Sequence, residues 1–570
     1  MHDLVIRDAR VVDGTGTEGR IADVAIDGQT ITEVGAALGP GRREIAADGL
    51  LMMPGWVDIH SHFDGQATWD PYMTPSSWHG VTTSVFGNCG VGFAPVRPGS
   101  EPYLINLMEG VEDIPGSVLA EGIDFRWESF EEYLDVLAET PRIMDVGAQM
   151  PHGALRFYVM GERGADHTEV PSVGEIAEMG GLLEAALAAG ALGFTTSRTI
   201  KHRAADGSPT PSLSAHEDEL LGMADALRRA GAGVFEVNSD LGNDDFALLR
   251  RCAERAGRPL SMLLLQADED PERWRRTLAG IQAANRDGVA MNGQVGCRPI
   301  GIMMGLDTTI NPFVSHPAWA DLKDLPAAAR LARLQEDAAL RRRLVEERPE
   351  DGHTRWMASA LAKSFEMANP VDYEPDPSQT MTARAKAAGV DVWRFTLDLL
   401  CRGSGDTLLL FPFENYSGGD LEVVREMLLA DNTVCGLGDA GAHVATICDA
   451  SYPTTLITHW ARDRTRGEGL PLEFLVRKQT FETARTYGLD DRGVIAPGYK
   501  ADFNLVDFDA LGLGLPTVAH DLPAGGRRLV QRSRGYRYTF VSGVEVSCDG
   551  EATGALPGVL VRGAQARVNA

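Results

Sequence analysis

Lysine is scarce in this chain of 570 residues, and positive charge as a whole is outweighed by negative charge. Only six of the 53 basic residues are lysines, and 81 acidic residues give a formal net charge of −28. A negative field of this size repels phosphate backbones and anionic lipid headgroups. Nucleic acid and membrane surfaces are therefore not expected as partners.

Cysteine and long apolar runs are also scarce. The seven cysteines are scattered without regular spacing, which indicates reduced thiols rather than a disulfide framework. No apolar run approaches the ~18 residues that indicate a membrane span. The N-terminal stretch Met-His-Asp-Leu-Val-Ile-Arg lacks the charged-then-apolar pattern of a signal peptide. We therefore expect a cytoplasmic location.

The remaining composition is that of an ordinary folded protein. Hydrophobic residues make up 44% of the chain and charged residues 24%, which excludes wholesale disorder. Domains usually contain roughly 100–200 residues, and barrels reach about 250. A chain of 570 residues is therefore expected to contain two or three structural units.

Short alternating apolar segments at both ends of the chain predict β-strands. These segments are residues 4–12, 23–34, 501–507 and 536–543. Neither end has enough strands for a stable sheet of its own. We predict that residues 1–52 and 491–570 together form one small β-sandwich domain.

Between these ends, in residues 53–490, short apolar runs alternate with helical patterns. Eight strands alternating with helices are typical of an α/β fold of the (β/α)8 barrel type. About 135 residues separate the seventh run from the eighth, which is too long for a loop. Residues from about 298 to 430 are therefore predicted to form an inserted lid subdomain over one mouth of the barrel. The eight runs are residues 55–60, 81–86, 144–150, 191–196, 233–237, 260–265, 289–295 and 433–438.

The first of these runs leads into a His-Ser-His motif, in the segment Pro54-Gly-Trp-Val-Asp-Ile-His60-Ser-His62. Side chains two residues apart on a strand point to the same face, so His60 and His62 can bind one metal ion. A bare His-x-His motif is common by chance. Its position at the end of a barrel's first strand, on the face where catalytic residues lie, favours a metal site.

Two further turns that follow predicted strands carry candidate ligands. Cys89 lies in a glycine-flanked turn after the second strand, where a thiolate would lie near the histidines; a buried cysteine that only packs is the alternative. Asp439 ends the eighth strand, and its carboxylate could bind a metal and accept a proton from water. An aspartate that only caps the next helix is the alternative. Because the first and eighth strands of a barrel are neighbours, the functional interpretation of Asp439 is favoured.

These motifs together resemble the amidohydrolase superfamily. The resemblance rests on the His-x-His motif, the cysteine turn, Asp439 and residues 493–502, which look like the superfamily's return into its β domain. Residues 87–95 and 109–115 resemble the D-aminoacylase branch, which hydrolyses N-acyl-D-amino acids. The resemblance implies a barrel fold, hydrolytic chemistry and a centre of one or two divalent metal ions, usually zinc.

The sequence departs from the family pattern in two respects. The fourth predicted strand lacks the lysine that many superfamily members carbamylate; in the D-aminoacylase branch a cysteine replaces it, which fits Cys89. That branch also takes ligands from histidines ending strands five and six, and neither strand contains histidine here. Strand five carries Glu236, and a buried glutamate on a strand is rare without a partner. We predict Glu236 as a metal ligand or a residue that contacts one; an absent second site is the alternative.

Two residues are candidates for substrate binding. Arg198 follows the fourth strand, where its guanidinium could pair with a substrate carboxylate through two hydrogen bonds. An arginine that only faces solvent is the alternative. His443 lies near Asp439 and could bind substrate or orient that carboxylate, and a structural histidine at a helix start is the alternative.

We expect a metal-dependent hydrolase that cleaves a linear amide bond, with an N-acyl-D-amino acid as its small-molecule substrate. The metal would lower the pKa of a bound water toward ~7, and Asp439 would take the proton and pass it to the leaving amine. A hydrolase of a cyclic amide, lactam or ester on the same scaffold is one alternative. A non-catalytic assembly protein that has lost the two histidines is another. The sequence does not fix the oligomeric state, and a homo-oligomer is compatible with it.

Overall fold

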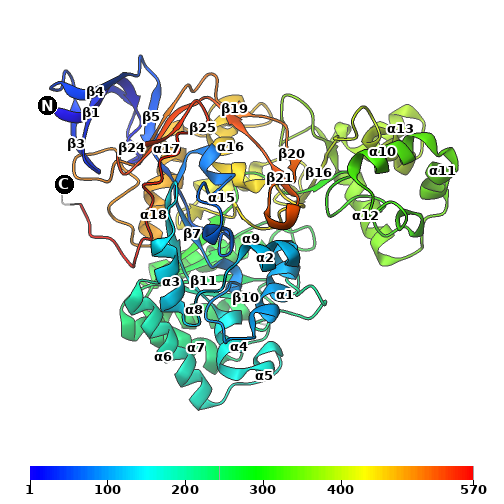
Figure 1. Cartoon of the computed structure of the whole chain (residues 1–570), viewed down its shortest axis with the longest axis horizontal. Helices are drawn as coiled ribbons and strands as arrows, with labels where there is room; N and C mark the ends of the chain where they lie inside the picture. The colour runs from blue at the N-terminus through cyan, green and yellow to red at the C-terminus, as the bar shows by residue number, and fades with distance from the viewer. Residues whose placement is uncertain (243, 569–570) are drawn as a thin grey trace.

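The chain folds into an α/β protein with three parts (Figure 1). The computed structural model describes residues 1–242 and 244–568. A β-sheet carries segments from both chain ends, a parallel core with its helices lies in the centre, and a helical lobe extends to the right in Figure 1. The α/β fold that the sequence predicts is confirmed.

The parallel core consists of two sheets whose strands follow the order of the chain. The first sheet contains β6, β7 and β8, and the second runs in the order β17-β13-β12-β11-β10-β9. An isolated parallel bridge between Ser61 and Ala440 joins the segments that follow β6 and β17. Each predicted apolar run overlaps an observed strand. The strands are β6 Trp56–Asp58, β7 Val81–Phe86, β8 Asp145–Ala148, β9 Met150–Pro151, β10 Gly193–Arg198, β11 Val234–Ser239, β12 Leu260–Leu263, β13 Met291–Val295 and β17 Thr433–Cys435.

Amphipathic helices connect these strands and bury their apolar faces against them. Helix α6, Val173–Ala189, begins with a capping box formed by Ser172 and Glu175 and ends at Gly190, which has a left-handed φ of 116°. It packs on α7, and both helices contribute leucines to the largest core cluster. The other helices of this part are α1 Glu101–Glu112, α2 Gly116–Gly122, α3 Phe130–Glu139, α4 His152–Met160, α5 Glu162–Ala165, α7 Glu217–Ala230, α8 Asp245–Ala256, α9 Arg273–Arg286, α15 Glu422–Leu429, α16 Tyr452–Thr458, α17 Leu472–Arg477 and α18 Thr483–Thr486.

Strands from both chain ends pair in one nine-stranded sheet. Its order is β25-β24-β23-β18-β5-β1-β2-β3, with β4 also paired to β1. The junction between the two ends is the antiparallel pair β5–β18, in which Met53 lies opposite Asn504. The two-sheet sandwich and the domain boundaries stay predictions. The strands are β1 His2–Val11, β2 Arg20–Asp27, β3 Thr30–Gly35, β4 Gly41–Ala46, β5 Leu51–Pro54, β18 Phe503–Val506, β23 Tyr536–Val541, β24 Val544–Cys548 and β25 Glu551–Ala552.

The insertion between β13 and β17 has a sheet at its base and a helical lobe beyond it. The base is the antiparallel sheet β14-β16-β15, and the lobe has an apolar cluster of its own around Trp319, Leu344 and Leu397. Figure 1 places the lobe at the far end of the molecule, away from the sheet of the chain ends. The elements are β14 Ile300–Met304, α10 Ala327–Glu336, α11 Ala338–Glu346, α12 Gly352–Lys363, β15 Phe365–Glu366, α13 Met381–Ala388, α14 Val392–Leu400 and β16 Leu409–Glu414.

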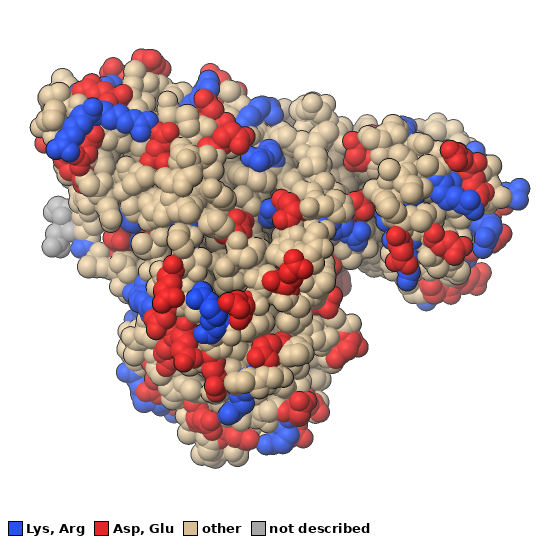
Figure 2. Space-filling view, in the orientation of Figure 1, with Lys and Arg blue, Asp and Glu red and all other residues tan. Residues whose placement is uncertain are grey.

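Charge is distributed over all three parts. On the face shown in Figure 2, Asp and Glu side chains are spread over the helices of the core and the lobe, with Lys and Arg among them. None of the helices in the described part of the chain has the length and apolar character needed to cross a bilayer. Whether nucleic acid or membrane surfaces are excluded as partners stays a prediction.

Candidate metal centre

Four side chains that the sequence singles out converge at the C-terminal ends of the parallel strands. The Nε2 atom of His60 lies 3.1 Å from Oδ1 of Asp439, and Nε2 of His62 lies 3.6 Å from the same oxygen. The Sγ atom of Cys89 lies 3.5 Å from His60 Nε2. Ligand atoms of His60, His62 and Cys89 all lie within 4.8 Å of one another. Two imidazoles, a thiol and a carboxylate therefore surround one point.

The backbone between the first and last strands fixes these positions. The Asp439 amide donates to His60 O at 3.1 Å, and the His62 amide donates to Ala440 O at 2.7 Å. Cys89 has a left-handed φ of 55°, in a turn that approaches β10 so closely that a Cβ on Gly90 would lie 2.9 Å from Ser197 N. The glycines of the cysteine turn thus allow the thiol to reach the histidines.

Glu236 lies at the floor of this group. Its side chain, on β11, is fully buried, and its Oε2 accepts a hydrogen bond from the Cys89 amide at 3.1 Å. The second oxygen, Oε1, lies 3.8 Å from His60 Nδ1 and has no hydrogen-bond partner among the described residues. An unpartnered carboxylate oxygen this deep in a protein is costly. The geometry is consistent with Glu236 as a ligand, a role that stays a prediction.

Glu112 is a site residue that the sequence interpretation missed. It is the last residue of α1, fully buried, with its Oε1 atom 3.3 Å from His62 Nδ1 and its Oε2 atom 3.4 Å from His443 Nε2. The sequence contains a signal for this position. Leu104, Met108 and Glu112 are spaced four residues apart, so Glu112 lies on the same buried face of the helix as the two apolar residues. A carboxylate on such a stripe needs a buried partner.

The charges of the two histidines are set by their surroundings. Burial would lower the pKa of His60, but the Asp439 carboxylate, its hydrogen bond and Glu236 raise that pKa to about 9. Burial lowers the pKa of His62 to about 4, so this imidazole is neutral and has a free lone pair. Burial would also raise the pKa of Asp439, but His60 and the hydrogen bonds from both histidines hold it well below its usual range.

The remaining acidic groups of the site are hard to ionise without a cation. Burial raises the pKa of Glu236 to about 7 and that of Glu112 well above its usual range. Burial and the neighbouring carboxylates raise the pKa of the Cys89 thiol in the same way. A divalent cation at this point would displace these protons. The donor set, with nitrogen, sulfur and carboxylate oxygen, fits zinc or a similar divalent ion.

The two predicted substrate-binding residues differ in their positions. His443 lines the main cavity described below and contacts Glu112. Arg198 is held by Asp245 through two hydrogen bonds of 2.9 and 3.1 Å, and it also donates to Ala215 O. The guanidinium of Arg198 is therefore engaged within the protein, and its role in substrate binding stays a prediction.

The cavity at the candidate metal centre, which we call the main cavity, has a volume of about 440 Å³ and opens beside Asp439 and His443. Its walls come from β11, the segment after β12, helix α9 and the base of the insertion. Phe413 and Ile302 of that base line it, so the sheet of the insertion, rather than the helical lobe, covers the site. The volume is in the range of small-molecule sites.

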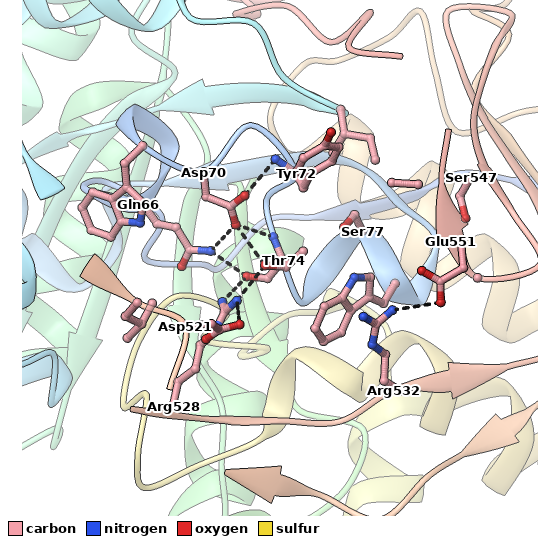
Figure 3. Close-up of a pocket in the computed structure, with 16 residues that line it drawn as sticks. Gln66, Asp70, Tyr72, Thr74, Ser77, Asp521, Arg528, Arg532, Ser547 and Glu551 are labelled. Atoms are coloured by element: carbon pink, nitrogen blue, oxygen red, sulfur yellow. Dashed lines mark hydrogen bonds and ion pairs between the residues drawn. The ribbon is translucent and has the colours of Figure 1, made fainter. Parts of the chain in front are cut away.

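A second cavity, of about 400 Å³, lies where the loop after β6 meets the C-terminal segment (Figure 3). Figure 3 shows Asp70 and Thr74 of the loop facing Arg528 and Asp521. Arg528 donates to Thr74 O and Oγ1, each at 2.8 Å, and forms an ion pair with Asp521. These contacts tie the loop that follows His60 and His62 to a segment more than 400 residues later in the chain.

Comparisons with known proteins agree with this arrangement. A sequence model of the amidohydrolase family matches residues 43–391 and 407–547. This is most of the chain, and the chain therefore belongs to the amidohydrolase family. The resemblance that the sequence motifs indicate is confirmed.

Within the family, the chain is similar to several individual proteins. The chain is 35% identical over 232 residues to an N-acyl-D-aspartate deacylase of Alcaligenes xylosoxydans xylosoxydans. The aligned region covers 40% of this chain and 42% of the relative. It is 33% identical over 195 residues to a D-aminoacylase of the same organism, covering 34% of this chain and 37% of the relative. The chain thus spans less than half the length of these two relatives. An uncharacterised protein of Mycobacterium tuberculosis is 28% identical over 566 residues, covering 93% of this chain and 89% of that protein.

Solved structures share the fold. A D-aminoacylase, described with a binuclear metal centre, superposes with a TM-score of 0.65 at 22% identity, covering 99% of this chain and 100% of that one. The N-acyl-D-glutamate deacylase of Bordetella bronchiseptica, complexed with zinc and a phosphonate inhibitor, superposes with a TM-score of 0.65 at 21% identity, covering 98% and 99%. At these identities the similarity shows the fold alone.

Proposed function

We propose that this protein is a metal-dependent hydrolase of a linear amide bond, and that its substrate is an N-acyl-D-amino acid. The observation that carries the proposal is the contact of one carboxylate, Asp439, with both His60 and His62 at the mouth of the main cavity. The similarity to deacylases of N-acyl-D-amino acids supports the substrate class. We also propose that the parallel core closes into a (β/α)8 barrel, with the Ser61–Ala440 bridge as its seam.

The residues that would hold the ion are His60, His62, Asp439 and Cys89, with Glu236 as a further ligand. A divalent ion at this point, for which we propose zinc, would supply positive charge to polarise the amide carbonyl and to acidify a water molecule.

The protein's own groups carry the proton and fix the geometry. Asp439 accepts the proton of the attacking water and passes it to the amine that leaves. The His60 ring is oriented by a hydrogen bond of 2.8 Å between its Nδ1 and Gln294 Oε1. Glu112 orients the ring of His62, because carboxylates that contact a ligand imidazole fix its tautomer and direction. The buried surroundings strengthen each of these interactions.

Two other functions compete with this proposal. The same scaffold could hydrolyse a cyclic amide, a lactam or an ester, because Asp439 and an ion would serve those reactions equally well. The chain could also be a non-catalytic assembly protein. The buried group of two histidines, a thiol, and the Glu112 and Glu236 carboxylates argues against the second alternative. Oxygens of both carboxylates have no hydrogen-bond partner among the described residues, which destabilises the fold without an ion.

Metal content and substrate range test the proposal together. We expect the purified protein to contain a divalent metal by elemental analysis and to hydrolyse N-acyl-D-amino acids faster than N-acyl-L-amino acids, hydantoins and lactones. The double variant His60→Ala, His62→Ala should lose both metal and activity while retaining its circular dichroism spectrum. The exposed pair His216→Ala, His520→Ala is the matched control and should lose neither. Retained metal in the first variant would disprove the assignment of the ligands.

A further inference from the structure

One cation in the main cavity is not neutralised by a carboxylate. Arg273, the first residue of α9, lines the cavity and donates from Nη1 to the backbone oxygen of Asp240 at 3.0 Å. Its guanidinium forms no ion pair with a carboxylate of the described residues, although Glu414, the partner of Lys201, attracts it over a longer distance. The other nitrogens of this planar group are thus available to a ligand.

The neighbouring charged groups already have ion-pair or hydrogen-bond partners within the protein. Lys201 also lines the cavity, but its ammonium group forms an ion pair with the buried carboxylate of Glu414. The Asp240 carboxylate accepts from Thr199 Oγ1 at 2.8 Å and from Ile200 N at 2.7 Å. The carboxylate of Asp113 accepts from Thr446 and Thr309. Arg273 is therefore the side chain best suited to a substrate anion, and the carboxylates around it disfavour a second anionic group.

Most of the remaining lining is apolar. Leu263, Leu265 and Trp274 form one wall, and Ile300, Ile302 and Phe413 of the insertion form the other. Such walls bind hydrocarbon and exclude charge, because an unpaired charge buried there loses its hydration. The main cavity thus offers one anion contact within an apolar chamber.

We propose that Arg273 binds the single carboxylate of the substrate and that the apolar walls select an amino acid with a hydrocarbon side chain or acyl group. This inference rests on the proposed function and narrows its substrate class. Arg273 would act as a specificity residue, and Arg198, which Asp245 already engages, would not have this role. N-acyl derivatives of leucine and phenylalanine should be better substrates than those of aspartate and glutamate, whose second carboxylate would meet Glu414, Asp113 or Asp240.

The test compares Arg273→Met with the parent on two matched compounds, N-acetyl-leucine and its primary carboxamide, in the favoured stereochemical series. We expect kcat/KM for the acid to fall on the order of 10²-fold, as for a lost hydrogen bond to a charged group, and kcat/KM for the carboxamide to stay within about threefold. Arg273→Lys should recover part of the loss because it keeps the charge. Arg275→Met, an exposed site on the same helix, is the matched control and should change neither value.

Several outcomes would overturn the inference. Equal losses on both compounds with full metal content would show a structural role for Arg273, and a selective loss in Arg198→Met instead would move the carboxylate to Arg198. N-acetyl-aspartate hydrolysed as well as N-acetyl-leucine would contradict the preference for one carboxylate. If the parent hydrolyses neither compound, the proposed function fails. In that case, calorimetry on the zinc-loaded protein still tests the inference. N-acetyl-leucine that binds more tightly than its carboxamide, with this difference abolished in Arg273→Met, supports the inference. Equal binding of the two compounds refutes it.

Discussion

At the scale of single residues, Asp439 combines two duties, since it contacts both imidazoles and faces the main cavity. Asparagine at this position would keep the size of the side chain and one ligand oxygen but could not accept a proton. We expect Asp439→Asn to lower turnover on the order of 10²–10⁴-fold with the fold intact and metal at least partly retained. Steady-state kinetics and metal analysis on one sample measure this. Near-parental turnover would place the base elsewhere, with Glu236 and His443 the next residues to test.

The Glu112 carboxylate contacts His62 on the side of the ring away from Asp439, and it also contacts His443. Glutamine there would be close in size but would lack the negative charge that faces His62 and His443. We expect Glu112→Gln to weaken metal binding by ~10–100-fold, the usual cost of losing a carboxylate behind a ligand imidazole. Competition with a chromogenic chelator measures the affinity, and Glu101→Gln in the first turn of the same helix is the control. A loss of thermal stability with unchanged metal affinity would reduce Glu112 to a packing role.

The contrast between Glu236 and Glu112 shows what sequence reasoning can reach. Glu236 stands within a short apolar run, where a charged residue is conspicuous, and the structure places it beside the Cys89 amide. Glu112 ends a helix, and no rule of strand order places a helix end beside His62. The four-residue spacing of Leu104, Met108 and Glu112 indicates that Glu112 lies on the buried face of the helix, but it does not indicate that His62 is its partner. The predicted site residues lie on or just after strands, whereas Glu112, at the end of a helix, and Gln294, on β13, are not predicted by the sequence.

At the scale of elements, Glu374 anchors the insertion to the parallel core. Its side chain is 2% exposed and contacts His459 at 3.1 Å and Arg464 at 3.0 Å. It also accepts from the Leu421 amide at 2.8 Å. The segment of the insertion between β15 and α13 is thereby fixed to the helical region after α16 and to the start of α15.

This anchor predicts a dependence of stability on pH. Burial would raise the pKa of Glu374, but hydrogen bonds from His459 and Arg464 lower it to about 2 from 4.5. A lowered pKa contributes stability that is complete above pH 4.5 and is lost as the pH falls toward 2. We expect Glu374→Gln to cost about 2 kcal/mol at pH 7, with the gap to the parent closing below pH 4.5. Thermal melting across this range measures it.

The partly exposed Glu422, which also contacts Arg464, provides the control for this experiment. Glu422→Gln should cost less than about 1 kcal/mol, because exposed ion pairs contribute little. A pH-independent gap between Glu374→Gln and the parent would show that the loss comes from packing rather than from the charge.

Element positions were predictable to different degrees. The eight apolar runs located the core strands because buried parallel strands are continuous hydrophobic segments. The sheet at the base of the insertion was not predicted, because its strands β14 and β16 are separated by the whole helical lobe. Pairing over such a distance leaves no periodic signal in the sequence, which therefore predicts an inserted lid but not its sheet.

At the scale of the whole molecule, the nine-stranded sheet depends on both chain ends. In its order, β18 lies between β5 and β23, so β5 has a free edge without the C-terminal segment. We expect deletion of the residues after Lys500 to cause aggregation, because an exposed edge strand pairs with other chains. Size-exclusion chromatography measures the outcome. A truncated protein that stays monodisperse and as heat-stable as the parent would contradict a composite domain.

The ion pair of Arg528 with Asp521, and its hydrogen bonds to Thr74, have a consequence for biosynthesis. The ribosome makes His60 and His62 early, but Asp439 appears hundreds of residues later, and the segment that clamps their loop appears later still. N-terminal parts of a growing chain fold first where they can, and here they cannot complete their sheet. If the proposed function holds, the nascent chain carries two histidines and a thiol without their carboxylate, and metal is bound only after Asp439 has been made.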